Sequence, residues 1–226
     1  MQSIIEVMQS QLWFYLTTVG LVSLCVGSFL NVVIYRLPLM MQREWQSECR
    51  LLLEDELNTN QAKPKNTSEH FNLVKPNSTC PKCKTAIKPW QNIPIISWLI
   101  LKGKCASCSN PISIRYPAIE AITALLSLVV AYTFGATEQA LLYIVITWAL
   151  VALTFIDIDH MLLPDQLTLP LVWLALIAAV AGITITPSDA IMGAAFGYLS
   201  LWSVFWLFKL LTGKEGMGYG DFKLLA

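Results

Sequence analysis

At 226 residues, with 55% hydrophobic and only 13% charged side chains and a mean hydropathy of +0.57, the chain is too apolar for an ordinary soluble domain. Its 15 basic and 15 acidic residues cancel, but 12 of the 15 Lys and Arg residues lie between Arg36 and Arg115. This distribution excludes a uniformly basic nucleic-acid-binding protein and indicates a membrane protein with one large, positively charged loop.

Five segments lack Asp, Glu, Lys and Arg, and each is about long enough to cross a bilayer as a helix. They are residues 7–35, 121–137, 139–156, 166–188 and 190–208. A membrane span must satisfy its own main-chain hydrogen bonds, and a helix does so locally. We therefore predict an all-α polytopic membrane protein, a helical bundle of five full spans plus the start of a sixth.

The polar loop between the first two spans is predicted to be cytoplasmic, because positively charged loops stay on that side of a membrane. The N-terminus then lies outside, and Asp157 and Asp221 both fall at the cytoplasmic face. Residues 37–79 are predicted to be mostly irregular. Arg43 to Leu57 fits either a short amphipathic helix on the membrane or a solvated helix.

Two CxxC sequences lie in this loop, Cys80-Pro81-Lys82-Cys83 and, 21 residues later, Cys105-Ala106-Ser107-Cys108. Each short turn directs two thiolates at one point, which suits tetrahedral Zn²⁺ and predicts a zinc-knuckle loop domain. A redox CxxC pair and disulfides are the alternatives, and a reducing cytoplasm disfavours stable disulfides.

An apolar segment separates the two CxxC sequences. Residues 90–99 are rich in Trp and Ile, and Pro94 interrupts them, so they are too short to span the bilayer. They fit either a membrane-surface element or the core of the small loop domain.

Carboxylates beside hydrocarbon are costly, so those at the ends of apolar runs are candidates for function. Asp157 ends one run, and Asp221 closes Gly218-Tyr219-Gly220-Asp221. Aspartic proteolysis needs two such groups, close enough to share a proton and hold a water molecule. Glycines beside Asp221 let the main chain approach a substrate strand. Asp159 is the rival of Asp157, whereas Asp165 is expected to cap the following helix.

With these motifs in place, the chain resembles the type IV prepilin peptidases, also called type 4 prepilin leader peptidases and N-methyltransferases. The similarity covers most of the chain in the family's order. It includes residues 27–38, both CxxC sequences with Asn92-Ile93-Pro94 between them, residues 113–117 with Glu120, residues 157–165, and Gly218 to Leu225.

The resemblance implies a GxGD-type intramembrane aspartic protease of the bacterial inner membrane, of the kind that serves type IV pili and type II secretion. Such enzymes cut the basic leader from prepilins and pseudopilins at a Gly–Phe-type junction on the cytoplasmic face. They then methylate the new N-terminal residue with S-adenosylmethionine. The partners implied are these substrates and membrane lipid, with no nucleic acid.

Residue by residue, the resemblance assigns catalysis to Asp157 and Asp221, with Gly218, Gly220 and Asp159 in support. It places the zinc or cysteine site on Cys80, Cys83, Cys105 and Cys108, and methyl transfer near Gly103 and Lys104. Relatives often carry Glu where this chain has Gln91, which puts a methylation role for a carboxylate there in doubt.

The domains expected are a first transmembrane helix (1–36), a cytoplasmic loop domain with the CxxC pairs (37–116) and a transmembrane peptidase core (117–226). Relatives continue for about two more spans, so we expect residues 1–226 alone to be weakly active or inactive.

Three other functions are alternatives. A membrane thiol oxidoreductase would explain the CxxC pairs but not GxGD, and a transporter would explain the carboxylates but not the cysteine loop. A non-catalytic pilus or secretion assembly factor is the third.

Overall fold

The computed structural model describes residues 4–57, 71–214, 216 and 218–226, and helices are the main secondary structure of these residues. Within those ranges no strand forms, and only two isolated β-bridges occur. The described chain divides into two compact units, one built from residues 23–122 and the other from the N-terminal residues to 22 together with residues 123–226. The all-α prediction is confirmed.

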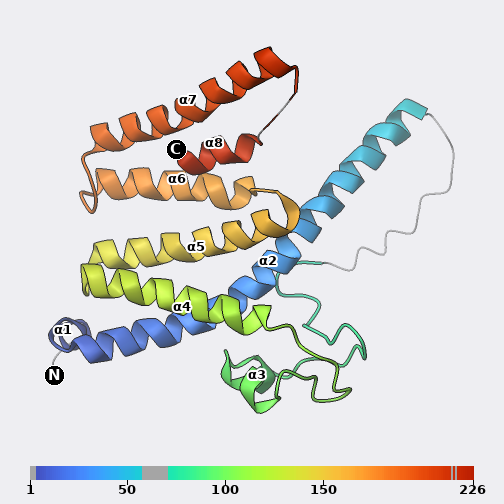
Figure 1. The fold of residues 1–226 in the computed structure, drawn as a ribbon, viewed down its shortest axis with the longest axis vertical. Helices are drawn as coiled ribbons and strands as arrows, with labels where there is room; N and C mark the ends of the chain where they lie inside the picture. The colour runs from blue at the N-terminus through green and yellow to red at the C-terminus, as the bar shows by residue number, and fades with distance from the viewer. Residues whose placement is uncertain (1–3, 58–70, 215, 217) are drawn as a thin grey trace. The chain divides into compact units, whose positions relative to one another are not determined.

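The helices run as follows in chain order (Figure 1): α1 Ile4–Ser10, α2 Leu12–Leu57, η1 Pro89–Asn92, α3 Ile96–Ile100, α4 Arg115–Phe134, α5 Glu138–His160, α6 Asp165–Val180, α7 Pro187–Thr212 and α8 Tyr219–Leu225. Among the described residues, α2, α4, α5 and α7 are long and apolar enough to cross a membrane. These four helices indicate a membrane protein.

The predicted span over 166–188 is shorter than expected. Helix α6 has 16 residues, about 24 Å at 1.5 Å per residue. It ends before Gly182, whose φ of +73° belongs to the left-handed region. Thr186 then caps α7 by accepting the Asp189 N–H, and Pro187 opens that helix. A count of uncharged residues does not register these end signals.

Helix α2 differs from the sequence prediction because it continues well past the first apolar run, through Pro38 and on to Leu57. Arg36 is buried beside that proline and donates to the carbonyls of Asn72, Leu73 and Pro76 at 2.7–3.3 Å. The returning chain is thus fixed to the side of α2. Residues 37–42, which we expected to be irregular, are helical, and the helix predicted from Arg43 to Leu57 forms as the continuation of α2. Residues 58–70 of the predicted irregular stretch lie outside the described residues.

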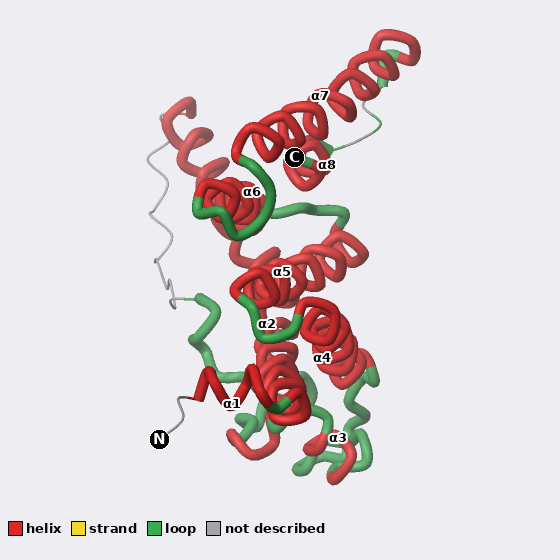
Figure 2. The backbone as a smooth tube through the Cα atoms, turned by 90° about the vertical axis from the view of Figure 1, so that its left-hand side faces the viewer, coloured by secondary structure: helices red, strands yellow, loops and turns green. Residues whose placement is uncertain are grey.

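In the unit of residues 23–122, the segment after residue 70 consists mostly of loops and turns around α3 (Figure 2). Asn31 on α2 donates to the Tyr116 carbonyl of α4 at 3.2 Å, which ties the two helices together.

In the other unit, Tyr15, Ala131 and Ile144 form a buried cluster. Helix α8 packs against both α6 and α7, and Figure 1 shows it lying between them.

Candidate active site and metal centre

The four predicted cysteines converge on one point. Their sulfur atoms all lie within 4.8 Å of one another, with Cys80 Sγ 3.8 Å from Cys108 Sγ and Cys83 Sγ 4.0 Å from Cys105 Sγ. A zinc–sulfur bond of about 2.3 Å gives sulfur–sulfur edges of about 3.8 Å in a tetrahedron. The cluster can therefore hold a tetrahedral metal ion with little rearrangement.

The two cysteine turns have the same main-chain design. In the first, Lys84 N–H donates to Cys80 O at 2.9 Å; in the second, Ser109 N–H donates to Cys105 O at 3.0 Å. Lys84 and Ser109 both have positive φ, 59° and 56°. An isolated β-bridge closes each turn, Thr79 with Ala86 and Lys104 with Pro111. The two sulfur pairs are therefore positioned by the same main-chain geometry.

The thiols have uneven proton affinities. Hydrogen bonds to the hydroxyl and main chain of Thr85 lower the pKa of Cys83 to about 6, and main-chain hydrogen bonds from Cys108 and Ser107 lower the pKa of Cys105. A main-chain hydrogen bond from Asn110 acts to lower the pKa of Cys108, but burial and the neighbouring thiols outweigh it and raise that pKa to about 11. Four adjacent thiolates repel one another, so a bound cation is what allows all four to ionise.

Gly103 sits directly beneath an indole ring. Its φ is +66°, and a Cβ built there would lie 2.9 Å from Cζ2 of Trp98. The Trp98 Nε1–H donates to Ile112 O at 3.2 Å, and Ile112 N–H donates to Gly103 O at 2.7 Å. Gly103 therefore has a packing role that the sequence did not reveal, and Lys104 follows it as the exposed start of the second cysteine turn.

The GxGD segment opens α8, with Gly218 as its N-cap. A Cβ on Gly220 would lie 2.6 Å from Cβ of Leu163, in the turn between α5 and α6. Only glycine allows so close an approach. Phe222 is fully buried and packs edge-on against Tyr198 and Phe205 of α7.

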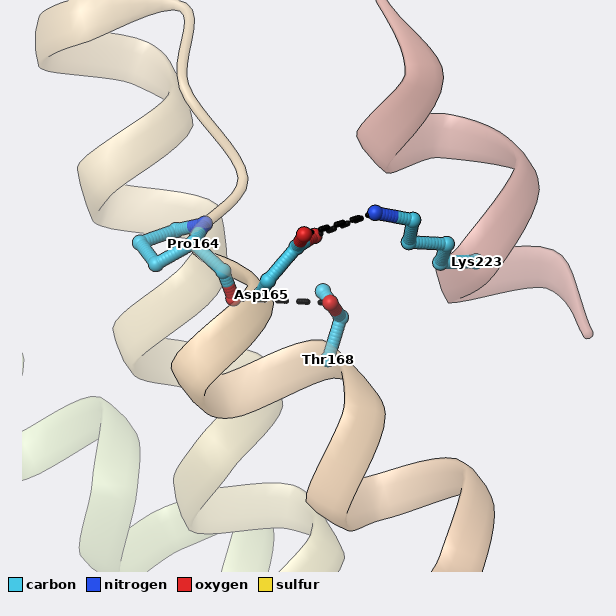
Figure 3. Close-up of polar contacts among 4 residues, drawn as sticks. All are labelled: Pro164, Asp165, Thr168 and Lys223. Atoms are coloured by element: carbon cyan, nitrogen blue, oxygen red, sulfur yellow. Dashed lines mark hydrogen bonds and ion pairs between the residues drawn. The ribbon is translucent and has the colours of Figure 1, made fainter.

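An ion pair also fastens α8 to α6. Lys223 Nζ lies 2.7 Å from both carboxylate oxygens of Asp165 (Figure 3). Asp165 is the first residue of α6, and Pro164 is its N-cap, without a side-chain cap bond. The expectation that Asp165 caps this helix is therefore wrong: its carboxylate is used in the long-range pair instead.

Asp157 lies in the last turn of α5, and Asp221 lies in the first turn of α8. Met161 N–H donates to Asp157 O at 2.7 Å to end the helix, and Leu163, two residues further on, contacts Gly220. The fold thus brings the GxGD segment onto the turn that follows Asp157. The Asp157 and Asp159 side chains are exposed, and Asp221 is half-buried.

Sequence reasoning missed the roles of two buried charged residues. Arg36 binds three carbonyls, as described above. Glu120, on α4, accepts the Ile95 N–H at 2.7 Å. Gln91, which stands where relatives often have Glu, accepts the Lys88 N–H at 2.9 Å and so closes the short η1 turn. A buried charge inside an apolar helix was the available signal for Glu120.

Comparison with known proteins gives two family matches that together cover most of the chain. Residues 21–134 match the bacterial peptidase A24 N-terminal domain, and residues 144–226 match the type IV leader peptidase family. No solved structure matches the chain.

Curated relatives named "Prepilin leader peptidase/N-methyltransferase" are similar over nearly all of it. The Pseudomonas aeruginosa protein is 57% identical over 94% of this chain and 71% of its own length. The Aeromonas salmonicida protein is 52% identical over 100% and 76%, and the Legionella pneumophila protein is 46% identical over 95% and 72%. The chain therefore belongs to the type IV leader peptidase family.

Proposed function

We propose that this protein is a membrane aspartic endopeptidase that removes the leader peptide from type IV prepilins and pseudopilins and N-methylates the new N-terminal residue. The main support for this proposal is the packing of Gly220 against Leu163, which places the GxGD segment on the turn after Asp157. Both segments lie within residues 144–226, which match the type IV leader peptidase family. Relatives at 46–57% identity bear the name of that dual activity.

Asp157 and Asp221 are the proposed catalytic pair. One carboxylate takes a proton from a water molecule as its oxygen attacks the scissile carbonyl; the other, protonated, gives its proton to the leaving amine. Gly218 and Gly220 support Asp221 by setting the course of the main chain, and Asp159 supports Asp157 from the same helix turn.

The loop domain and the catalytic pair are proposed to face the cytoplasm of the bacterial inner membrane, with the N-terminus in the periplasm. The basic content of residues 36–115 supports this orientation. The substrate's basic leader would then be cut before the rest of the pilin leaves the membrane.

The cysteine cluster is proposed to hold structural Zn²⁺ through Cys80, Cys83, Cys105 and Cys108. S-adenosylmethionine would supply an electrophilic methyl group to the exposed N-terminal amine. Gly103 and Lys104 are proposed to support that step, with Gly103 acting through the turn that carries Trp98. Zinc content measured with a count of free thiols tests the site, since a thiol oxidoreductase would hold disulfides and no zinc.

The deciding experiment uses Asp157→Asn, Asp221→Asn and Asp159→Asn in the complete membrane enzyme. Each variant is scored for prepilin cleavage and, separately, for methylation of substrate already cleaved. We expect the first two to lose cleavage and keep methylation, while Asp159→Asn keeps methylation and cleaves at a reduced rate. Cleavage by both of the first two variants would refute the aspartic mechanism. Inactivity of Asp159→Asn alone would move the first role from Asp157.

A further inference from the structure

The segment between the two cysteine turns does not form the core of the loop domain. Ile96, Leu99 and Ile100 of α3 are 55%, 60% and 68% exposed, and no α3 residue is buried. Ser97 and Trp98 of this helix are half-buried, and Trp98 contacts Gly103. An apolar surface of this kind in a membrane protein requires an apolar neighbour.

The start of α3 is attached to two of the helices that can span the membrane. Ile95 N–H donates to Glu120 Oε2 on α4 at 2.7 Å, and Ser28 Oγ on α2 lies 3.5 Å from Asn92 O. Glu120 follows Arg115 by five residues, about 7.5 Å along a helix axis. The main chain at residues 92–95 therefore lies beside α2 and α4, close to the polar ends of these two membrane helices. Irregular backbone at that depth is tolerated where protein groups satisfy it, as Glu120 does here.

The sequence segment that carries α3 is basic. Residues 71–119 contain seven Lys and Arg residues and no Asp or Glu. Lys88 precedes η1 and Lys102 follows α3, and both side chains are exposed. Basic residues beside an apolar interfacial helix are attracted to anionic lipid headgroups.

We propose that residues 89–100 form an interfacial segment that lies in the headgroup–acyl boundary of an anionic leaflet. Ile96, Leu99 and Ile100 enter the acyl region, and Lys88 and Lys102 contact the headgroups. The partner is the lipid leaflet itself. A prepilin helix is the competing occupant, and the experiment below separates the two. This placement does not depend on the catalytic assignment, because it follows from the attachments to α2 and α4.

The test places the photoreactive residue p-benzoylphenylalanine at Leu99, and in a second variant at Ile100, in the complete protein. Vesicles contain phosphatidylcholine with or without phosphatidylglycerol, and no prepilin is added in the first series. Ser107, an exposed residue of the second cysteine turn, is the control position. Bound zinc is measured in every variant to confirm that the loop domain is folded.

We expect lipid adducts at positions 99 and 100 to exceed those at 107 at least fivefold. The yield should fall severalfold without phosphatidylglycerol, or in a Lys88→Glu, Lys102→Glu variant. Equal labelling at 99, 100 and 107 would overturn the interfacial assignment. So would cross-linking of residue 99 to added prepilin at the expense of lipid. A yield unchanged in pure phosphatidylcholine would overturn the headgroup role of the lysines.

Discussion

Replacement of Gly103 by alanine should destabilise the loop domain rather than remove a group that touches the methyl donor. The residue has a φ of +66°, and an added Cβ would meet two ring atoms of Trp98, at 2.9 and 3.1 Å. Both atoms belong to the rigid indole, which is held in place by its hydrogen bond to Ile112 O. The ring therefore cannot move aside as the end of a flexible chain would.

The expected cost has two parts. The left-handed conformation costs an alanine roughly 1–2 kcal/mol, and overpacking against a fixed ring costs about 1–3 kcal/mol. Together they amount to about 2–5 kcal/mol, and every 1.4 kcal/mol is about tenfold in an equilibrium constant. Because metal binding and folding of a small cysteine domain are coupled, zinc affinity should weaken at least tenfold.

The assay is zinc competition with a chelator on the purified enzyme, run beside methylation of pre-cleaved substrate. Gly135→Ala is the matched control, since Gly135 has a φ of +65° with no atom within 4 Å of an added Cβ. It should leave zinc affinity unchanged. Trp98→Leu combined with Gly103→Ala should recover part of the lost affinity, because the ring that causes the overlap is gone.

One result would refute this reasoning. If Gly103→Ala keeps the zinc affinity of the unchanged protein within twofold and still loses methylation, Gly103 acts directly in methyl transfer.

Three further predictions concern the attachments of α8 and α3. Lys223→Ala and Asp165→Ala should each slow prepilin cleavage severalfold, with about 1 kcal/mol or less lost from the free energy of unfolding. The exchanged pair Asp165→Lys, Lys223→Asp should recover activity. Unchanged cleavage in both single variants would show that the pair is only a surface contact. Phe222→Ala should lower the free energy of unfolding by about 3–5 kcal/mol through the cavity it leaves, and should abolish cleavage while zinc content stays intact. Normal cleavage by this variant would contradict a structural role for α8. Glu120→Gln should keep zinc binding and methylation, because the amide oxygen of the new side chain still accepts the Ile95 N–H. Glu120→Leu leaves that N–H without an acceptor and should lower the stability of the fold by about 1–3 kcal/mol, measured by zinc release. Equal behaviour of the two variants would argue against the hydrogen bond.

The sequence predicted the membrane helices and the cysteine cluster because both depend on local patterns. Runs without charge mark hydrocarbon-spanning helices, and CxxC turns carry their geometry with them. A four-cysteine metal site required only that the two turns lie next to each other, and the positions of the four sulfur atoms show that they do.

What the sequence did not predict depends on long-range packing. Asp165 looked like a cap from its neighbours, but its partner Lys223 is 58 residues away. Arg36 on α2 binds the carbonyls of Asn72 and Pro76, which lie 36 and 40 residues further along the chain. Neither contact leaves a periodic trace in the sequence.

The sulfur pairing has a consequence for everything between the two cysteine turns. Cys80 faces Cys108, and Cys83 faces Cys105, so the outer and inner cysteines pair in a nested order. A metal ion bound by these cysteines would join the two ends of a loop that contains α3. Loss of the metal ion would restore the conformational entropy of the loop. The contacts of Glu120 and Ser28 would then hold the start of α3 without the metal site. Removal of the metal ion should therefore loosen the attachment of α3 to the helices beside it.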